Sequence, residues 1–241
     1  MRIQRALARA GIASRRAADA LVGAGRVTVN GTVAITGQTV DPARDDIRVD
    51  GKRLAAPQTT RWFVLNKPAG VTTTRSDERG RPTVFSLVPD VPGLTYVGRL
   101  DLLTEGVLLL TTDGIAAHRL SHPSGEVTRT YVATVRGSAR EAAERARAGV
   151  ELDDGTVRAE DVDVTPAGRG AWNFSVTIRE GRKREVRRLC EALGLEVVRL
   201  VRTAYGPITL GTLKPGEWRE LSLNEVERLL PPPRGAGRSG P

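Results

Sequence analysis

The chain of 241 residues has little of what builds disulfide or metal sites: one cysteine and two histidines. A single thiol, Cys190, excludes an internal disulfide framework and is typical of a protein of the reducing cytoplasm. With only His118 and His122 beside it, the ordinary zinc clusters cannot form. We therefore expect a cytoplasmic protein without a metal site.

Long apolar runs are also missing, and none reaches the roughly 18–20 residues that cross a membrane. No G-x-x-x-x-G-K-[ST] loop occurs, so nucleotide hydrolysis has no support. Aromatic residues are scarce, with three each of Trp, Tyr and Phe. These absences disfavour a membrane partner, a nucleotide cofactor and the aromatic platforms of a sugar-binding cleft.

Positive charge is abundant, with a formal net charge of +9 and a pI near 10.6. Such a balance indicates a polyanionic partner, most simply nucleic acid. Nearly all basic residues are arginine, which suits phosphate binding, although a GC-rich genome produces the same bias. Hydrophobic content of 39% and charged content of 27% are typical of a globular chain.

The N-terminal segment predicts two short helices. Apolar residues share one face of Ile3–Ala10, and Gly11 suits its end. Ser14 is a good N-cap for a second helix over Arg15–Ala24, which Gly25 closes. Several arginines lie on or beside these helices: Arg2, Arg5, Arg9, Arg15 and Arg16.

A hairpin is predicted over Val27–Val33, because Asn-Gly favours a type I′ turn between β-branched runs, and Asp46–Val49 is a further strand. This helix–helix–hairpin order over residues 1–54 resembles an S4 domain, a small RNA-binding module. The segment carries ten basic and five acidic residues, which is +5 of the total charge. The resemblance implies that its arginines bind RNA, whereas a solvated helix face is the plainer alternative.

Residues 55–60 form a predicted linker, and strand-like runs dominate from residue 61 to 230. Interleaved strands with few helices indicate an α+β domain around a largely antiparallel or mixed sheet with flanking helices. The proline- and glycine-rich tail, residues 231–241, is predicted to be disordered. Predicted strands are Trp62–Leu65, Val107–Thr111, Thr130–Val135, Arg158–Val164 and Trp172–Ile178. Predicted helices are Ser138–Ala148, Glu185–Leu193 and Leu223–Leu230.

The run GRLDLLTEG places an ionisable residue, Asp101, beside leucines, where an unpaired charge is expensive to bury. This run resembles the nucleophile motif of pseudouridine synthases, RNA enzymes that detach and rotate the base of uridine. The resemblance implies that Asp101 is the nucleophile. Two other interpretations remain: a surface ion pair with Arg99, and a glycosidase acid/base pair with Glu105.

Three further segments resemble the same family. Asn66–Gly70 resembles its K-P-x-G segment, although a simple turn has the same composition. Tyr131 matches the tyrosine that packs against the target uracil, although a strand tyrosine is commonly a core residue. In Glu180–Gly194, apolar spacing predicts a helix with Cys190 on its buried stripe. The resemblance implies that Arg187 pairs with Asp101, where a guanidinium would keep the carboxylate ionised.

Other basic residues are assigned RNA contacts. By resemblance, Arg99 contacts RNA and helps to hold the target nucleotide out of its stack, which costs a few kcal/mol. A glycine- and threonine-rich loop supplies candidates for backbone contacts, and so does the segment before the predicted helix at residue 185. These candidates are Arg75, Arg79, Arg81, Lys183 and Arg184.

Together the motifs identify the chain as resembling an S4-bearing ribosomal RNA pseudouridine synthase over residues 1–225. The implied reaction isomerises a uridine and requires no cofactor. The VRTAYGPITL run most resembles the large-subunit enzymes, so we expect 23S rRNA as the substrate and a monomeric enzyme. The alternatives are a 16S rRNA synthase and a non-catalytic RNA-binding protein of ribosome assembly.

Overall fold

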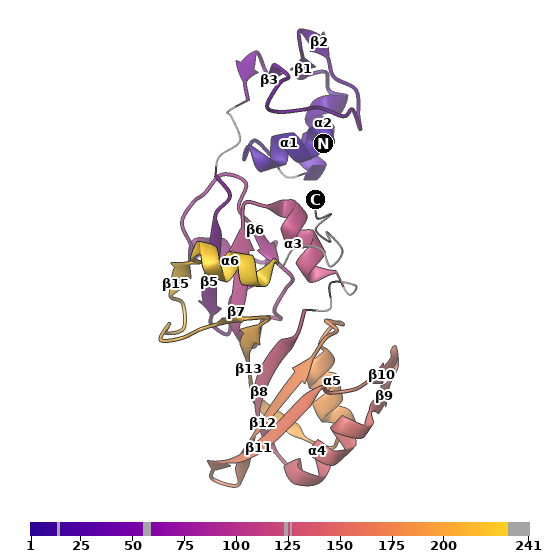
Figure 1. Ribbon diagram of the computed structural model, residues 1–241, viewed down its shortest axis with the longest axis vertical. Helices are drawn as coiled ribbons and strands as arrows, with labels where there is room; N and C mark the ends of the chain where they lie inside the picture. The colour runs from indigo at the N-terminus through magenta and orange to yellow at the C-terminus, as the bar shows by residue number, and fades with distance from the viewer. Residues whose placement is uncertain (14, 55–58, 123–124, 126, 231–241) are drawn as a thin grey trace, which may run out of the picture.

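The computed structural model describes residues 1–13, 15–54, 59–122, 125 and 127–230. The predicted helix cap at Ser14, most of the predicted linker and the tail at 231–241 lie outside these residues. The fold is α+β, as the alternation of strands and helices predicts. Figure 1 shows an elongated chain in which the N-terminal helices and hairpins lie at one end of a long sheet. No helix in the described ranges is long and apolar enough to span a bilayer.

The N-terminal unit packs two helices against a small antiparallel sheet in the order β2-β1-β3-β4. Asn30 and Gly31 both have positive φ, at 52° and 83°, as the predicted type I′ turn requires. Ile3, Leu7 and Ile47 are fully buried in its core. Its elements are α1 (Ile3–Arg9), α2 (Arg15–Gly23), β1 (Val27–Val29), β2 (Thr32–Val33), β3 (Ile47–Val49) and β4 (Lys52–Arg53).

The larger unit is built on one sheet in the order β11-β12-β8-β13-β7-β5-β15, with β6 beside β7 and β14 beside β13. Every strand pair in it is antiparallel except β13 with β7. The strands are β5 (Trp62–Lys67), β6 (Thr95–Val97), β7 (Thr104–Thr111), β8 (Arg129–Arg136), β11 (Asp161–Gly168), β12 (Ala171–Ile178), β13 (Glu196–Tyr205), β14 (Ile208–Thr209) and β15 (Trp218–Glu220).

Helices cover the sheet in two groups. Figure 1 shows α4 and α5 beside the β8–β12–β11 half, and α3 and α6 beside the half that contains β5 and β7. The predicted stripe of α5 is confirmed, because Val186, Leu189, Cys190 and Leu193 are all buried. The remaining elements are α3 (Gly114–Ser121), α4 (Ala139–Ala148), α5 (Glu185–Ala192), α6 (Leu223–Leu229), a 3₁₀ turn (Val84–Ser86), β9 (Val150–Leu152) and β10 (Gly155–Val157).

One local prediction was wrong in its bounds. The strand expected over Arg158–Val164 begins only at Asp161 and continues to Gly168. The predicted turn is present at Ala69–Gly70, but Lys67 is the last residue of β5 and is fully buried. The helix α3 and the long strand β13 were not predicted, although β13 lies at the centre of the sheet.

Close approach of the two units depends on glycine. A Cβ atom on Gly93 would lie 2.4 Å from the carbonyl oxygen of Arg9, and one on Gly11 would lie 2.6 Å from Cβ of Pro92. Both glycines have φ of +76°. The end of α1 therefore packs directly against the loop before β6, so the N-terminal unit contacts the larger one there.

Candidate active site

A cavity of about 710 Å³ opens where the loop before β7 meets β8, β13 and the start of α5. Residues far apart in the sequence line it together. Six of the residues predicted to act on or bind the substrate are in its wall: Arg99, Asp101, Tyr131, Lys183, Arg184 and Arg187.

Asp101 is half-buried at the start of a tight turn, in which the amide of Thr104 donates to the Asp101 carbonyl at 3.0 Å. Neighbouring segments hold this loop through its backbone. The hydroxyl of Thr73 donates to the Leu100 carbonyl at 2.9 Å, and the amide of Gly70 donates to the Leu102 carbonyl at 2.9 Å. The carboxylate is thus carried on a fixed loop at the cavity wall rather than out in bulk water.

The buried side chain of Lys67 holds the same loop by hydrogen bonds to its backbone. Its Nζ donates to the carbonyls of Leu102 and Thr104 at 3.3 and 2.9 Å, and to its neighbour Pro68 at 2.9 Å. Burial lowers the pKa of Lys67 to about 8, against the charges of Glu105 and Asp101, which raise it. The lysine of the K-P-x-G segment is therefore a buried support for the Asp101 loop.

Arg187 approaches the same loop from α5. Its Nη2 donates to the carbonyl of Leu103 at 3.0 Å, two residues after Asp101. Burial and the nearby charge of Arg184 lower the pKa of Arg187, whereas the charge of Asp101 raises it. The guanidinium is thus close enough to Asp101 to interact with its charge, while its hydrogen bond goes to the loop backbone.

Tyr131 lies on β8 and is 9% exposed. Its cross-strand partners are Val176 on β12 and Arg202 on β13. Paired residues in antiparallel strands point to the same face, so the tyrosine ring and the Arg202 side chain are neighbours. One ring therefore lies beside a buried cation in the wall of the cavity.

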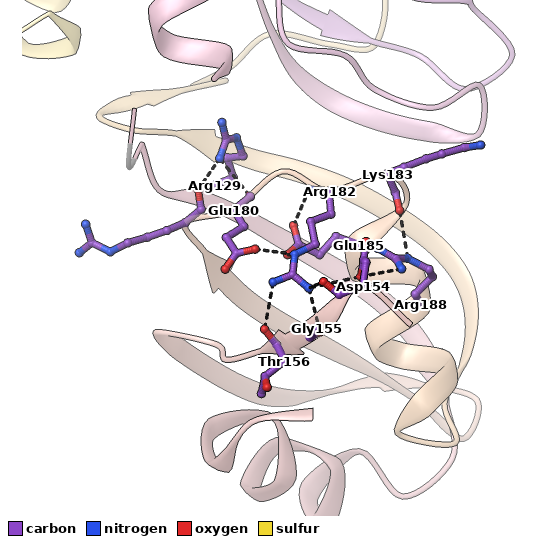
Figure 2. Close-up of polar contacts among 10 residues, drawn as sticks. Arg129, Asp154, Gly155, Thr156, Glu180, Arg182, Lys183, Glu185 and Arg188 are labelled. Carbon is purple, nitrogen blue, oxygen red and sulfur yellow. Dashed lines mark hydrogen bonds and ion pairs between the residues drawn. The ribbon is translucent and has the colours of Figure 1, made fainter. Parts of the chain in front are cut away.

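The loop before α5, which carries Lys183 and Arg184, is held by an arginine network (Figure 2). Arg182 donates to the carbonyls of Asp154, Gly155 and Thr156 at 3.1, 2.8 and 3.1 Å. Arg188 binds the Asp154 carboxylate through both terminal nitrogens at 2.9 and 2.7 Å. These hydrogen bonds lower the pKa of Asp154 to about 2. In Figure 2 the Lys183 side chain extends away from this network.

Sequence reasoning missed several buried polar residues of the cavity. Arg129, 4% exposed, donates to the Glu180 carbonyl at 3.0 Å and to the Leu120 carbonyl at 3.4 Å. Burial raises the pKa of Glu185, whose Oε2 accepts from the amide of Arg182 at 3.1 Å. Thr104 and Arg202 also line the cavity. For Thr104, Arg129 and Arg202 the only available signal was a polar residue within a strand. Glu185, the first residue of α5, had no such signal.

A second groove, of about 690 Å³, lies between α1 and the larger unit. Arg5, Arg9 and Arg75 line it, so three predicted RNA-binding residues from both units come together. Tyr96 and Ser121 line both this groove and the Asp101 cavity. The two hollows therefore adjoin each other.

The other predicted RNA-binding residues are spread over the surface. Arg2, Arg16 and Arg79 are exposed, and Arg2 donates to the Gly37 carbonyl. Arg81 is bound to the Asp77 carboxylate, with Nη2 to Oδ1 at 2.7 Å. The side chain of Arg15 lies outside the described part. Among the described side chains, Arg2, Arg16, Arg79 and Arg81 therefore line neither hollow.

The pairing of Asp101 with Glu105 as two acid/base groups has no geometric support. Both oxygens of Glu105 accept from Arg199 at 2.8 Å, and this hydrogen bonding lowers the pKa of Glu105. Glu105 is also absent from the described residues that line the cavity. A carboxylate held by its own arginine outside the cavity is poorly placed to act on a bound sugar.

Comparisons with known proteins agree with this organisation. Residues 61–192 match the RNA pseudouridylate synthase family and residues 1–47 match the S4 domain. The chain is 48% identical over 235 residues to an uncharacterized RNA pseudouridine synthase of Mycobacterium tuberculosis, covering 95% of this chain and 92% of that protein.

Two further relatives are named for their substrate or reaction. Ribosomal large subunit pseudouridine synthase B of Pseudomonas aeruginosa is 44% identical over 95% of this chain and 61% of that protein. A crystal structure of a pseudouridylate synthase shares 27% identity, with a TM-score of 0.66 over 95% of this chain and all of the other.

Proposed function

Because the chain belongs to the RNA pseudouridylate synthase family, we propose that it converts one uridine of 23S ribosomal RNA to pseudouridine, with Asp101 as the nucleophile. The observation that carries this proposal is the shared cavity of Asp101, Tyr131 and Arg187. Relatives named for the large ribosomal subunit, at 43–44% identity, support the substrate.

In the proposed reaction the target uridine leaves its stack and enters the Asp101 cavity, where Tyr131 packs against the ring. The carboxylate attacks either C6 of the ring or C1′ of the ribose. The N1–C1′ bond breaks, the uracil turns, and its C5 bonds to C1′ as the bond between Asp101 and the substrate breaks. C5 then gives up its proton and N1 takes one up, which releases the free carboxylate. Substrate and product are isomers, so positioning and charge stabilisation carry the catalysis, with no cofactor consumed.

The remaining roles follow from position. Arg187 holds the Asp101 loop and keeps positive charge near the carboxylate. Arg99, Lys183 and Arg184 are exposed around the same cavity, where they can contact the RNA backbone. The adjoining groove with Arg5 and Arg9 supports a path for the RNA from the S4 domain to the cavity. The proposal places a monomeric enzyme in the cytoplasm, where ribosomal RNA is available.

The test is to incubate the protein with unmodified 23S and 16S rRNA and to map pseudouridine by carbodiimide-blocked primer extension. We expect one new stop in 23S rRNA with the wild type and none with Asp101→Asn. The variant should bind the RNA within about threefold of the wild type, because affinity rests mainly on phosphate contacts.

Each other outcome selects an alternative. A stop in 16S rRNA alone would make the enzyme a small-subunit synthase. Tight binding without any stop would favour a non-catalytic role in ribosome assembly. An equal stop with Asp101→Asn would remove Asp101 from the mechanism.

A further inference from the structure

Three buried polar atoms in residues lining the Asp101 cavity have no hydrogen-bond partner among the described residues. They are the hydroxyl oxygen of Thr104, Oε1 of Glu185 and Nη2 of Arg202. These residues are only 2%, 4% and 2% exposed. Nearly all buried polar groups in folded proteins find a partner, so a cluster of exceptions at one cavity indicates a ligand that supplies the missing partners.

Glu185 has a partial explanation within the protein. Its Oε1 lies 4.0 Å from Nε of Arg182, and its Oε2 accepts from the Arg182 amide. That leaves Thr104 and Arg202 as the two groups with an unmet hydrogen-bonding capacity and no compensating contact at the free atom.

Thr104 and Arg202 lie on the same face of the sheet as Tyr131. Arg202 pairs across the sheet with Tyr131, and Leu200, on the same face, pairs with Thr104. Thr104 also closes the turn that carries Asp101. The proposed nucleophile, the proposed stacking ring and the two residues with free groups therefore line one cavity.

The Arg202 side chain is fixed so that one nitrogen remains available. Its Nε donates to the Val107 carbonyl at 2.8 Å, and its guanidinium carbon lies 5.0 Å from the centre of the Tyr205 ring. Arginine stays charged in proteins, so this is a buried cation with an unused N–H. An oxygen that carries partial or full negative charge is the partner such a group requires.

We infer that Thr104 Oγ1 and Arg202 Nη2 donate hydrogen bonds to the carbonyl oxygens O2 and O4 of the everted uracil. This assignment rests on the proposed function. When the N1–C1′ bond breaks, its electron pair passes into the ring and negative charge spreads onto these two oxygens. Donors aimed at them strengthen as the charge develops, so they lower the barrier more than they strengthen ground-state binding. Both atoms are covered in the free protein, so the neighbouring side chains must move when the base enters the cavity.

Thr104→Val is the first test, with Thr111→Val as its control in the same strand. The Thr104 hydroxyl has no partner in the free protein, so the variant should melt at or above the wild-type temperature while kcat on an rRNA fragment falls about 10- to 100-fold. Thr111 donates to the Arg61 carbonyl at 2.9 Å, so its variant should melt lower with kcat unchanged.

The second test replaces one uracil oxygen by sulfur, a weaker acceptor, using rRNA fragments with 2-thiouridine or 4-thiouridine at the target. If a donor contacts that oxygen, the sulfur should slow the wild type more than the variant that lacks the donor, because the two losses are not additive. The variants are Thr104→Val and Arg202→Lys. Arg199→Lys, which alters an arginine paired with Glu105 on the same strand, is the control.

Two results would overturn the inference: full activity in Thr104→Val and Arg202→Lys, or equal sulfur effects in the wild type and both variants. Either result would leave the wild type forming pseudouridine, so the proposed function would stand. If the wild type formed none on any fragment, the proposed function itself would fail.

Discussion

At the scale of single residues, the site is built largely from charges that the fold has removed from water. Lys67 and Arg202 are both buried, and the charge of Arg202 contributes to lowering the pKa of Lys67. The nearby carboxylates of Asp101 and Glu105 act in the opposite direction on Lys67. Burying a charge is tolerated only when hydrogen bonds compensate, and the three carbonyls around Nζ provide them.

The depressed pKa of Lys67 makes stability depend on pH with a defined sign. The folded protein releases the Lys67 proton near pH 8, and the unfolded chain near its ordinary value of 10.5. Between these values the unfolded state binds more protons, so rising pH favours the folded state. Relative to Lys67→Met, the free energy of unfolding of the wild type should rise by roughly 3 kcal/mol from pH 8 to pH 10.5.

Urea unfolding of both proteins at closely spaced pH values measures this difference. The difference in unfolding free energy between the two proteins should be constant below pH 8 and above pH 10.5, because Lys67 then has the same protonation in the folded and unfolded states. Other groups titrate alike in the two proteins, so their contributions cancel. A difference that does not change over the whole range would mean that Lys67 has an ordinary pKa.

At the scale of elements, the parallel contact of β7 with β13 brings the Asp101 loop next to the strand of Arg202. Gly106 lies opposite Arg202 in this pair, with φ of +105°. A Cβ there would lie 2.1 Å from the Arg202 carbonyl oxygen, closer than any real contact. The two strands therefore need a glycine where they meet, and the last residue of GRLDLLTEG supplies it.

Gly106→Ala should consequently be far more damaging than an equivalent change in open space. Gly155→Ala is the matched control, because Gly155 has a similar φ of +110° but its nearest atom, in the Arg182 side chain, would be 3.6 Å from the new Cβ. We expect backbone strain to lower the free energy of unfolding of the control by about 1 kcal/mol. Overpacking should lower that of Gly106→Ala by roughly 3 kcal/mol more. Equal losses in denaturant unfolding would show that β7 can move away from β13.

At the scale of the whole molecule, the S4 domain and the catalytic domain share one surface. The end of α1 packs on the loop before β6, and the groove beside this contact adjoins the Asp101 cavity. Basic residues from both domains face this groove. An RNA bound in this groove would contact both domains at once. The S4 domain would then add phosphate contacts to those of the larger domain and would strengthen RNA binding without taking part in the reaction.

Replacing Arg5 and Arg9 by alanine together should therefore weaken rRNA binding and reduce its salt dependence. The slope of log K against log salt should become shallower by roughly 0.7 to 0.9 for each phosphate that the variant no longer neutralises. The control replaces Arg48 and Arg53, which have the same total charge but are both paired with Asp46. Filter binding at several salt concentrations measures the slopes, and identical slopes for both double variants would remove the groove from the RNA path.

Local sequence signals determined much of this protein. The helix stripes, the Asn30-Gly31 turn and the α+β class follow from periodicity and turn chemistry, which act over a few residues. The motif around Asp101 was also evident in the sequence. Its resemblance to the pseudouridine synthase family identified Tyr131 and Arg187 as candidate site residues. Each of these signals is contained in one short segment.

Tertiary structure alone decided which polar residues share the cavity. Thr104 and Arg202 are almost 100 positions apart, and each is only a polar residue in an apolar strand until β7 and β13 pair. The sequence placed Lys67 beside a turn and did not predict its burial. Two of its partners are backbone carbonyls 35 and 37 positions away, and sequence spacing does not indicate them. Burial and cross-strand neighbours are properties of the assembled sheet, so sequence spacing holds no direct signal for them.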